Sequence, residues 1–228
     1  MRDVGKFLQG FRRFQQHYLG EQHALFDQLL TEGQRPRALM IACCDSRCDP
    51  ALLTDCEPGD MFVVRNVANL VPPYDQARLF AATSSAIAFA VSSLEVEHVI
   101  IMGHAHCGGI QALMTHKTPE NDESKLISQW IGIAESAREQ VLQQLPNKTP
   151  EVQAHACEQA SILISLENLR SYPWISKRVE LGKLALHGWY FDMDKGELLQ
   201  YQQESGKFEV LVANGDKRPI SPFSSSKR

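Results

Sequence analysis

Three short apolar runs constrain the fold of this chain more than any other feature of its sequence. They span Ala38 to Ala42, Met61 to Val64 and Val99 to Met102, and each is continuously apolar. Runs of this length without polar alternation are typical of strands that are buried on both faces, as in parallel sheets. Between the second and third runs, Ala77 to Leu94 is rich in alanine and serine and has apolar residues at helical spacing. A strand, a crossover helix and a second strand predict an α/β fold with a parallel sheet.

The rest of the chain predicts further helices and a terminal arm. Phe7, Phe11 and Phe14 recur at helical spacing near the N-terminus, so one face of this helix is apolar. Such a face has to be covered, and we expect a partner subunit to cover it. We expect one domain, 1–228, with an N-terminal helical arm at 1–35 and a flexible tail at 213–228. The predicted helices span 3–18, 21–31, 77–94, 110–116, 124–145 and 150–170, with Pro146 and Pro173 as breaks, and a strand and hairpin follow over 183–201.

Composition excludes several classes of partner. The chain has 23 Lys and Arg against 27 Asp and Glu, a net charge of -4, which argues against a nucleic-acid partner. Its apolar runs are far shorter than the roughly 20 residues that a membrane helix needs. The N-terminus is interrupted by charges, unlike a secretory signal. We therefore expect a cytoplasmic protein with neither nucleic-acid nor membrane partners, whose six cysteines are reduced and form no disulfides.

Candidate metal ligands follow two of the predicted strands. Cys43 directly follows the first apolar run, and His104 and Cys107 follow the third. Because ligands bind at the carboxyl ends of parallel strands, we expect these side chains to form a site there. Two thiolates and one imidazole suit zinc, and three protein ligands leave a fourth position for water, as in catalytic zinc sites. The sequence predicts one Zn²⁺ per subunit, which would make a hydroxide nucleophile from water.

An acidic and a basic residue belong to the same motif. Asp45 stands two residues before Arg47, so the guanidinium can hold the carboxylate as an ionised, bidentate pair. We expect Asp45 to accept a hydrogen bond from the zinc-bound species and Arg47 to orient Asp45. Two thiolates cancel the charge of the zinc ion, so bound water should be less acidic than in a site of three neutral histidines. Activity is therefore expected to rise toward alkaline pH, and a flat pH–rate profile would contradict this.

These motifs, C-x-D-x-R at 43–47 and H-x-x-C at 104–107, resemble the signatures of the β-class carbonic anhydrases. The similarity covers about residues 4–212 and includes the segments Gly33–Pro36, Glu57–Asp60, Phe62–Asn69 and Leu186–Trp189. It implies a parallel α/β sheet with a final antiparallel strand. It also implies a homodimer with exchanged N-terminal helices, often paired into a tetramer. The implied reaction is the reversible hydration of CO2 to bicarbonate and a proton by zinc hydroxide.

The resemblance also implies roles for individual residues. Cys43, His104 and Cys107 match the zinc ligands of the family, and Asp45 with Arg47 matches its acid–base pair. The positions that match the substrate site are Gln34, which is thought to reach substrate across the dimer interface, the apolar residues Phe62, Val67 and Phe89, and Gly108. An apolar lining suits CO2, which carries no charge.

The chain departs from the family pattern near the site. Plant-like members commonly carry tyrosine where Phe89 stands, so that hydroxyl is absent here. In the bicarbonate-inhibited subgroup that this family resemblance brings in, Trp, Gly and Val stand at the positions of Met40, Ala42 and Cys48. This chain has none of those three residues. We therefore expect a plant-like site that is open and has no regulatory bicarbonate pocket.

Other interpretations compete with this one. His106 either transfers protons between the zinc water and solvent or is a structural histidine. Cys44 would be a fourth ligand in a closed structural site, but its position next to Cys43 makes joint coordination awkward.

Relatives on the same fold hydrolyse carbon disulfide or carbonyl sulfide. A non-catalytic zinc or thiol module is the other alternative, and the Asp45–Arg47 pair argues against it because a binding site needs no oriented acceptor.

Overall fold

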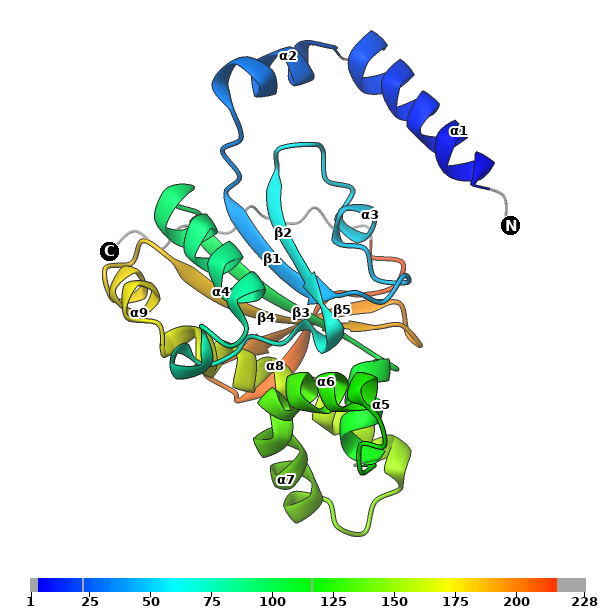
Figure 1. Ribbon diagram of the computed structural model, residues 1–228, viewed down its shortest axis with the longest axis vertical. Helices are drawn as coiled ribbons and strands as arrows, with labels where there is room; N and C mark the ends of the chain where they lie inside the picture. The colour runs from blue at the N-terminus through cyan, green and yellow to red at the C-terminus, as the bar shows by residue number, and fades with distance from the viewer. Residues whose placement is uncertain (1–3, 22, 116, 217–228) are drawn as a thin grey trace.

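The computed structural model describes residues 4–21, 23–115 and 117–216, whose strands form one six-stranded sheet flanked by helices (Figure 1). The strands are β1 Ala38–Cys43, β2 Met61–Asn66, β3 His98–His104, β4 Ala185–Asp192, β5 Glu197–Gln202 and β6 Lys207–Val212. The α-helices are α1 Gly5–Phe14, α2 His23–Glu32, α3 Pro50–Thr54, α4 Ala81–Ala88, α5 Gly108–Thr115, α6 Asp122–Ile131, α7 Glu135–Gln144, α8 Pro150–Arg170 and α9 Pro173–Glu180. Among these described residues, no helix is long and apolar enough to cross a bilayer.

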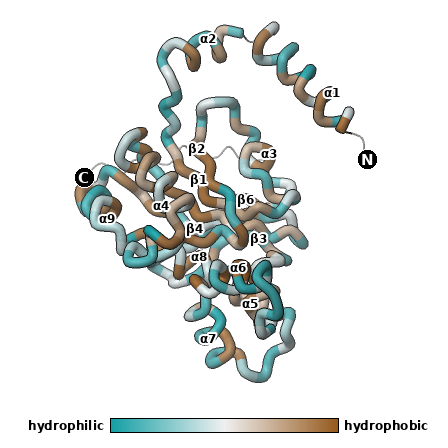
Figure 2. Tube along the Cα trace, viewed as in Figure 1, coloured by the Kyte–Doolittle hydropathy of each residue, from teal (hydrophilic) through white to brown (hydrophobic). Residues whose placement is uncertain are grey.

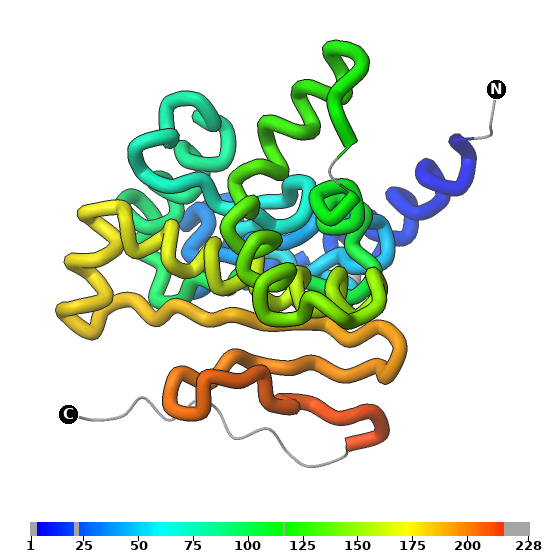
Figure 3. Tube along the Cα trace, turned by 90° about the horizontal axis from the view of Figure 1, so that it is seen from below, coloured from blue at the N-terminus to red at the C-terminus, as the bar shows by residue number. Residues whose placement is uncertain are grey.

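The sheet has the strand order β2-β1-β3-β4-β5-β6, and its first four strands are parallel. β5 is antiparallel to β4, and β6 is antiparallel to β5, so the sheet ends in a meander (Figure 3). The mostly parallel sheet and its antiparallel end are therefore confirmed, although β6 was not predicted. Ala42 of β1 pairs with Met102 of β3, so these two strands end close together at one edge of the sheet.

Both faces of the central strands are buried, which explains their unbroken apolar runs (Figure 2). Leu39 and Ile41 of β1 belong to a core cluster that also contains Ile87 of α4 and Ile162 of α8. Met40 and Ala42 point to the opposite face, as alternation along a strand requires, and cluster with Ile100, Met102 and Trp189.

The prediction that the second run is fully buried is wrong. β2 is an edge strand of the sheet, its residues are partly exposed, and Val63 is 40% exposed. Within one chain, an edge strand has a neighbour on one side only.

Several predicted helices differ in extent from those observed. The helix expected over 124–145 is two helices, α6 and α7, joined by a 3-10 turn at Gly132–Ala134. The crossover helix begins at Ala81 and continues as a π-helical turn over Phe89–Ser93. Pro173 was predicted as a break after α8, and it is also the first residue of α9. A proline is favourable there because the first N–H of a helix has no partner within the helix. The expected end of α5 at His116 lies outside the described residues.

The N-terminal arm is helical, as predicted. α1 continues as a π-helix over Gln15–Glu21, and α2 follows, while residue 3 of the predicted helix lies outside the described part. The arm extends away from the sheet in Figure 1. Phe7 is 74% exposed and Phe11 is 58% exposed, so the apolar face of α1 is uncovered in a single chain. Of the predicted tail, residues 217–228 lie outside the described residues.

Candidate metal centre

The sheet brings the three predicted ligands together at one edge. Cys43 is the last residue of β1, and His104 is the last residue of its parallel neighbour β3. A turn of two residues, Ala105 and His106, then leads to Cys107, which directly precedes α5. This turn contains His106 with a φ of 57°, in the left-handed region that few residues other than glycine adopt.

The ligand atoms of Cys43, His104 and Cys107 all lie within 4.8 Å of one another, and all three residues are buried. The two sulfur atoms are 3.9 Å apart. His104 Nδ1 lies 2.8 Å from the carbonyl oxygen of Ala105, so Nδ1 carries the hydrogen and donates it. His104 Nε2 is buried and has no hydrogen-bond partner. A free imidazole nitrogen among two thiols is a donor set that fits zinc.

The thiols of this centre differ in acidity. Hydrogen bonds from the Cys107 and Cys48 side chains lower the pKa of Cys43. The same hydrogen bonds to Cys43, together with burial, raise the pKa values of Cys107 and Cys48. Zinc binding at this centre would release the protons that its thiols carry, because thiolates are the ligands of zinc.

Asp45 and Arg47 form the bidentate ion pair expected from the sequence. Arg47 Nε donates to one carboxylate oxygen at 3.0 Å and Nη2 donates to the other at 2.7 Å. Hydrogen bonding from the Arg47 side chain lowers the pKa of Asp45 to about 2. Arg47 Nη2 also donates to the carbonyl oxygen of His106 at 3.1 Å, which links the two halves of the site. The catalytic roles of the pair stay predictions.

A second arginine holds the 43–49 loop through hydrogen bonds and an ion pair. Arg65, on β2, donates from Nε to the carbonyl oxygen of Cys43 at 3.0 Å and from Nη2 to that of Asp45 at 2.7 Å. Its Nη1 forms an ion pair with Asp49 at 2.6 Å. Asp49 also caps α3 through the backbone amides of Ala51 and Leu52. This role of Asp49 was not predicted, because its partner Arg65 is on β2, 16 residues along the chain.

The residues predicted to bind substrate lie in different parts of the structure. The rings of Phe62 and Phe89 are 5.8 Å apart. Val67 is 42% exposed, and a side chain on Gly109 would meet its Cγ1 at 2.7 Å, so Val67 lies against the start of α5. A Cβ added at Gly108 would meet nothing within 4 Å. Gln34 is exposed in the segment before β1.

His106 makes a contact that the sequence did not predict. Its Nε2 lies 2.9 and 3.0 Å from the two carboxylate oxygens of Asp194, in the turn between β4 and β5. Both side chains are more than half exposed, at 58% and 68%. The two residues are far apart in sequence, so no local pattern points to this pair.

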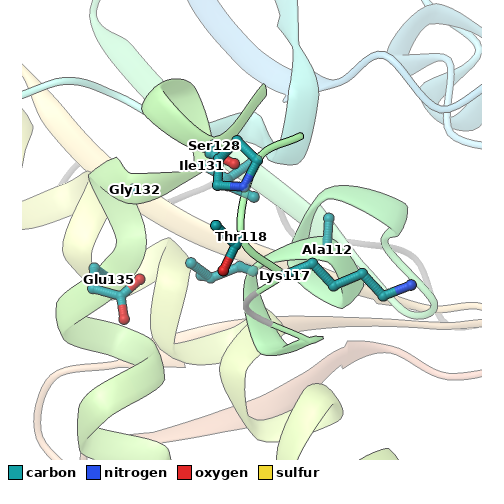
Figure 4. A pocket seen from close by; sticks show the side chains of 9 residues that line it. Ala112, Lys117, Thr118, Ser128, Ile131, Gly132 and Glu135 are labelled. Atoms are coloured by element: carbon teal, nitrogen blue, oxygen red, sulfur yellow. The ribbon is translucent and has the colours of Figure 1, made fainter. Parts of the chain in front are cut away.

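One cavity of the molecule lies away from these residues. It has a volume of about 320 Å³ and lies between α5, the 117–119 segment, α6 and α7 (Figure 4). Lys117, Ser128 and Glu135 supply its polar groups. None of the predicted site residues lines it.

Comparisons with known proteins agree with this geometry. A family model described as carbonic anhydrase matches residues 38–198, which include the three ligands and the Asp45–Arg47 pair. A carbonic anhydrase from Synechocystis sp. is 36% identical over 196 residues, which are 86% of this chain and 70% of that protein. Beta carbonic anhydrase 5, chloroplastic, from Arabidopsis thaliana is 43% identical over 163 residues. That alignment covers 72% of this chain but only 53% of the plant protein.

Solved structures are similar over most of their length. The β-carbonic anhydrase CcaA superimposes with a TM-score of 0.85 and 34% identity, covering 91% of this chain and 98% of that one. A tetrameric β-carbonic anhydrase from Sordaria macrospora has a TM-score of 0.73 and 27% identity, covering 86% of this chain and 96% of that one.

Proposed function

This chain belongs to the carbonic anhydrase family, and from that membership we propose that it uses zinc to interconvert CO2 and water with bicarbonate and a proton. One observation carries the proposal. The free Nε2 of His104 lies among two thiols, beside a carboxylate that Arg47 keeps ionised. Zinc bound there would supply Lewis acidity that makes water a nucleophile near neutral pH.

Asp45 and Arg47 have different roles in the proposed reaction. Asp45 accepts a hydrogen bond from the reacting water and so orients its lone pair toward CO2. Arg47 holds Asp45 in place with two hydrogen bonds. Asp45 is engaged by Arg47 and is not a member of the metal-ligand group, which supports an open site without a regulatory bicarbonate pocket.

CO2 would bind against the apolar side chains near the start of α5. Val67 presents apolar surface there, and Gly108 leaves room beside Cys107. Phe62 and Phe89, whose rings are 5.8 Å apart, are proposed as further apolar lining. In this proposal Gln34 comes from the partner subunit, because it lies in the exposed arm segment of its own chain.

We propose that the protein acts as a homodimer or a dimer of dimers. The exposed aromatic face of α1 supports this, because Phe7 and Phe11 have no covering surface in one chain. The Sordaria macrospora relative is described as tetrameric. A cytoplasmic location is also proposed, and it is supported by six unpaired cysteines, a state that reducing compartments maintain.

Stopped-flow CO2 hydration by the zinc-loaded protein tests the main proposal. We expect turnover in the wild type, a loss of about 100-fold or more in Asp45→Ala, and wild-type rates in Asp75→Ala, an exposed aspartate elsewhere. No hydration by zinc-loaded wild type would overturn the proposal. Turnover of carbon disulfide or carbonyl sulfide instead would select the related hydrolase reaction, and an unaffected Asp45→Ala variant would remove Asp45 from the mechanism.

We further propose that His106 passes protons to the solvent, held by Asp194. Removing it with His106→Ala should slow hydration in dilute buffer, and added imidazole should restore the rate. A structural histidine would give a defect that imidazole does not repair.

A further inference from the structure

A buried carboxylate lies directly behind the ligand Cys107. Glu158, in the middle of α8, is only 3% exposed. Its Oε1 accepts a hydrogen bond from the backbone N–H of Cys107 at 3.1 Å. Its Oε2 accepts one from the hydroxyl of Tyr190 on β4 at 2.7 Å. Both oxygens therefore have a donor, which a buried carboxylate requires.

The chain of hydrogen bonds continues to the surface. Tyr190 has one hydroxyl hydrogen, which it gives to Glu158, so its 3.0 Å contact with His155 requires Nδ1 of that ring to donate. The side chain of His155 is 48% exposed. Burial, together with the charge of Glu158, raises the pKa of Tyr190, so the hydroxyl keeps its hydrogen. An ordered polar path thus leads from the surface to the amide of a metal ligand.

The amide of Cys107 needs such a partner. It stands just before α5, where backbone N–H groups have no carbonyl of the helix to bind. The preceding residue, His106, has a φ of 57°, a conformation that is costly without glycine and persists only when the surroundings hold it. Fixing this peptide fixes the direction in which the Cys107 side chain leaves the backbone.

We propose that Glu158 is a positioning residue of the metal centre, which holds the peptide of Cys107 so that its sulfur faces Cys43 and His104. Tyr190 holds Glu158 in turn. The inference rests on the proposed function in one respect, namely that the centre takes zinc.

Two nearly isosteric substitutions test this role. Glu158→Gln leaves one acceptor oxygen for two donors, so either Cys107 or Tyr190 loses its partner. Tyr190→Phe removes the donor that orients the carboxylate. Outer partners of metal ligands typically change metal affinity by about 10–100-fold when they are lost. We expect a loss in this range for Glu158→Gln and a smaller loss in the same direction for Tyr190→Phe.

The measurements are zinc release to a chromogenic chelator and the absorption spectrum of the cobalt-substituted protein. Faster release and shifted thiolate-to-cobalt bands are expected for both variants. The matched control is Ser165→Ala, which removes a buried acceptor of α8 that bonds the amide of Val71 at 3.2 Å. The control should lower the midpoint of thermal unfolding without changing zinc release or the cobalt bands.

Equal acceleration of zinc release in Glu158→Gln and Ser165→Ala, at equal loss of thermal stability, would overturn the proposal. If Glu158→Gln does not fold, Tyr190→Phe decides, and wild-type release with wild-type cobalt bands in that variant would overturn it. Wild-type protein that binds zinc but does not hydrate CO2 would overturn the proposed function alone. Wild-type protein that binds no zinc would overturn both.

Discussion

Three hydrogen bonds from one arginine hold the carboxylate of Asp45. Two come from the Arg47 side chain, and the third comes from its backbone amide at 2.9 Å. The pKa of Asp45 falls to about 2 from an ordinary value of 3.8, mainly because the Arg47 side chain bonds to the ionised form. A folded-state pKa below the unfolded value stabilises the fold above pH 3.8, and this contribution is lost as the pH falls through about 2.

The substitution Arg47→Ala should therefore reduce stability in a pH-dependent way. Its free energy of unfolding should be below that of the wild type above pH 5, and the difference should disappear as the pH falls toward 2. Denaturant unfolding across this range, at one protein concentration, measures it. Arg47→Lys keeps the charge but loses the bidentate geometry, so its loss should be smaller. A difference that does not vary with pH would contradict the coupling between the two residues.

Single residues of the site were predictable to the extent that they stand in short motifs. Cys43, His104 and Cys107 follow apolar strands, so their convergence could be inferred from the topology of a parallel sheet. Glu158 and Asp194 reach the site from elements far along the chain. A buried glutamate in a helix looks like any surface glutamate in sequence, because only the packed structure provides its donors.

Among the elements, α8 packs behind the metal centre. It contacts both β3 and β4, and Gly103 and Gly188 leave room for its side chains. A Cβ on Gly103 would lie 2.7 Å from Ile162 Cδ1, and one on Gly188 would lie 2.9 Å from Ile162 Cγ2. Gly103 directly precedes the ligand His104, so α8 packs against β3 next to the metal centre.

Adding a methyl group at this contact should destabilise the fold. We expect Gly103→Ala to lower the free energy of unfolding by about 1–3 kcal/mol, the usual cost of overpacking a core. Ile162→Val removes the nearest atom, so the double variant should recover part of the loss, which a double-mutant cycle in denaturant will quantify. Purely additive losses would show that the two side chains do not meet.

The elements themselves were predictable where burial is uniform. β1 and β3 appear at their apolar runs because both faces of each strand are covered. β6 escaped prediction because it is a partly exposed edge strand with mixed polarity. The division between α6 and α7 at Gly132 also escaped, because the apolar spacing continues through the short 3-10 turn.

For the molecule as a whole, the uncovered arm predicts association. Phe11→Asp places a charge on the apolar face of α1, so it should shift the protein toward monomer in sedimentation experiments. Gln9→Asp adds the same charge to another exposed position of α1 and should leave the oligomer unchanged. An equal effect of the two substitutions would show that α1 does not use its aromatic face for association.

Removing zinc and measuring the stability of the whole protein tests the set of metal ligands. A ligand that binds only the folded state stabilises it by about 4 kcal/mol at a thousandfold excess over Kd. Chelation should therefore lower the unfolding temperature of the wild type. Cys44→Ser should behave like the wild type, because Cys44 is exposed and outside the ligand group, whereas Cys43→Ser should show no response to chelation. Loss of zinc stabilisation in Cys44→Ser would instead indicate a closed site with four protein ligands.

The position of the ligands at the ends of β1 and β3 also bears on the order of folding events. Cys43 and His104 are on strands that become neighbours only through a parallel, non-local pairing, which is slow to form. Full coordination is therefore not available until late in folding, and zinc cannot act as the nucleus. Zinc should instead lengthen the lifetime of the native state by slowing unfolding, and it should leave the refolding rate nearly unchanged.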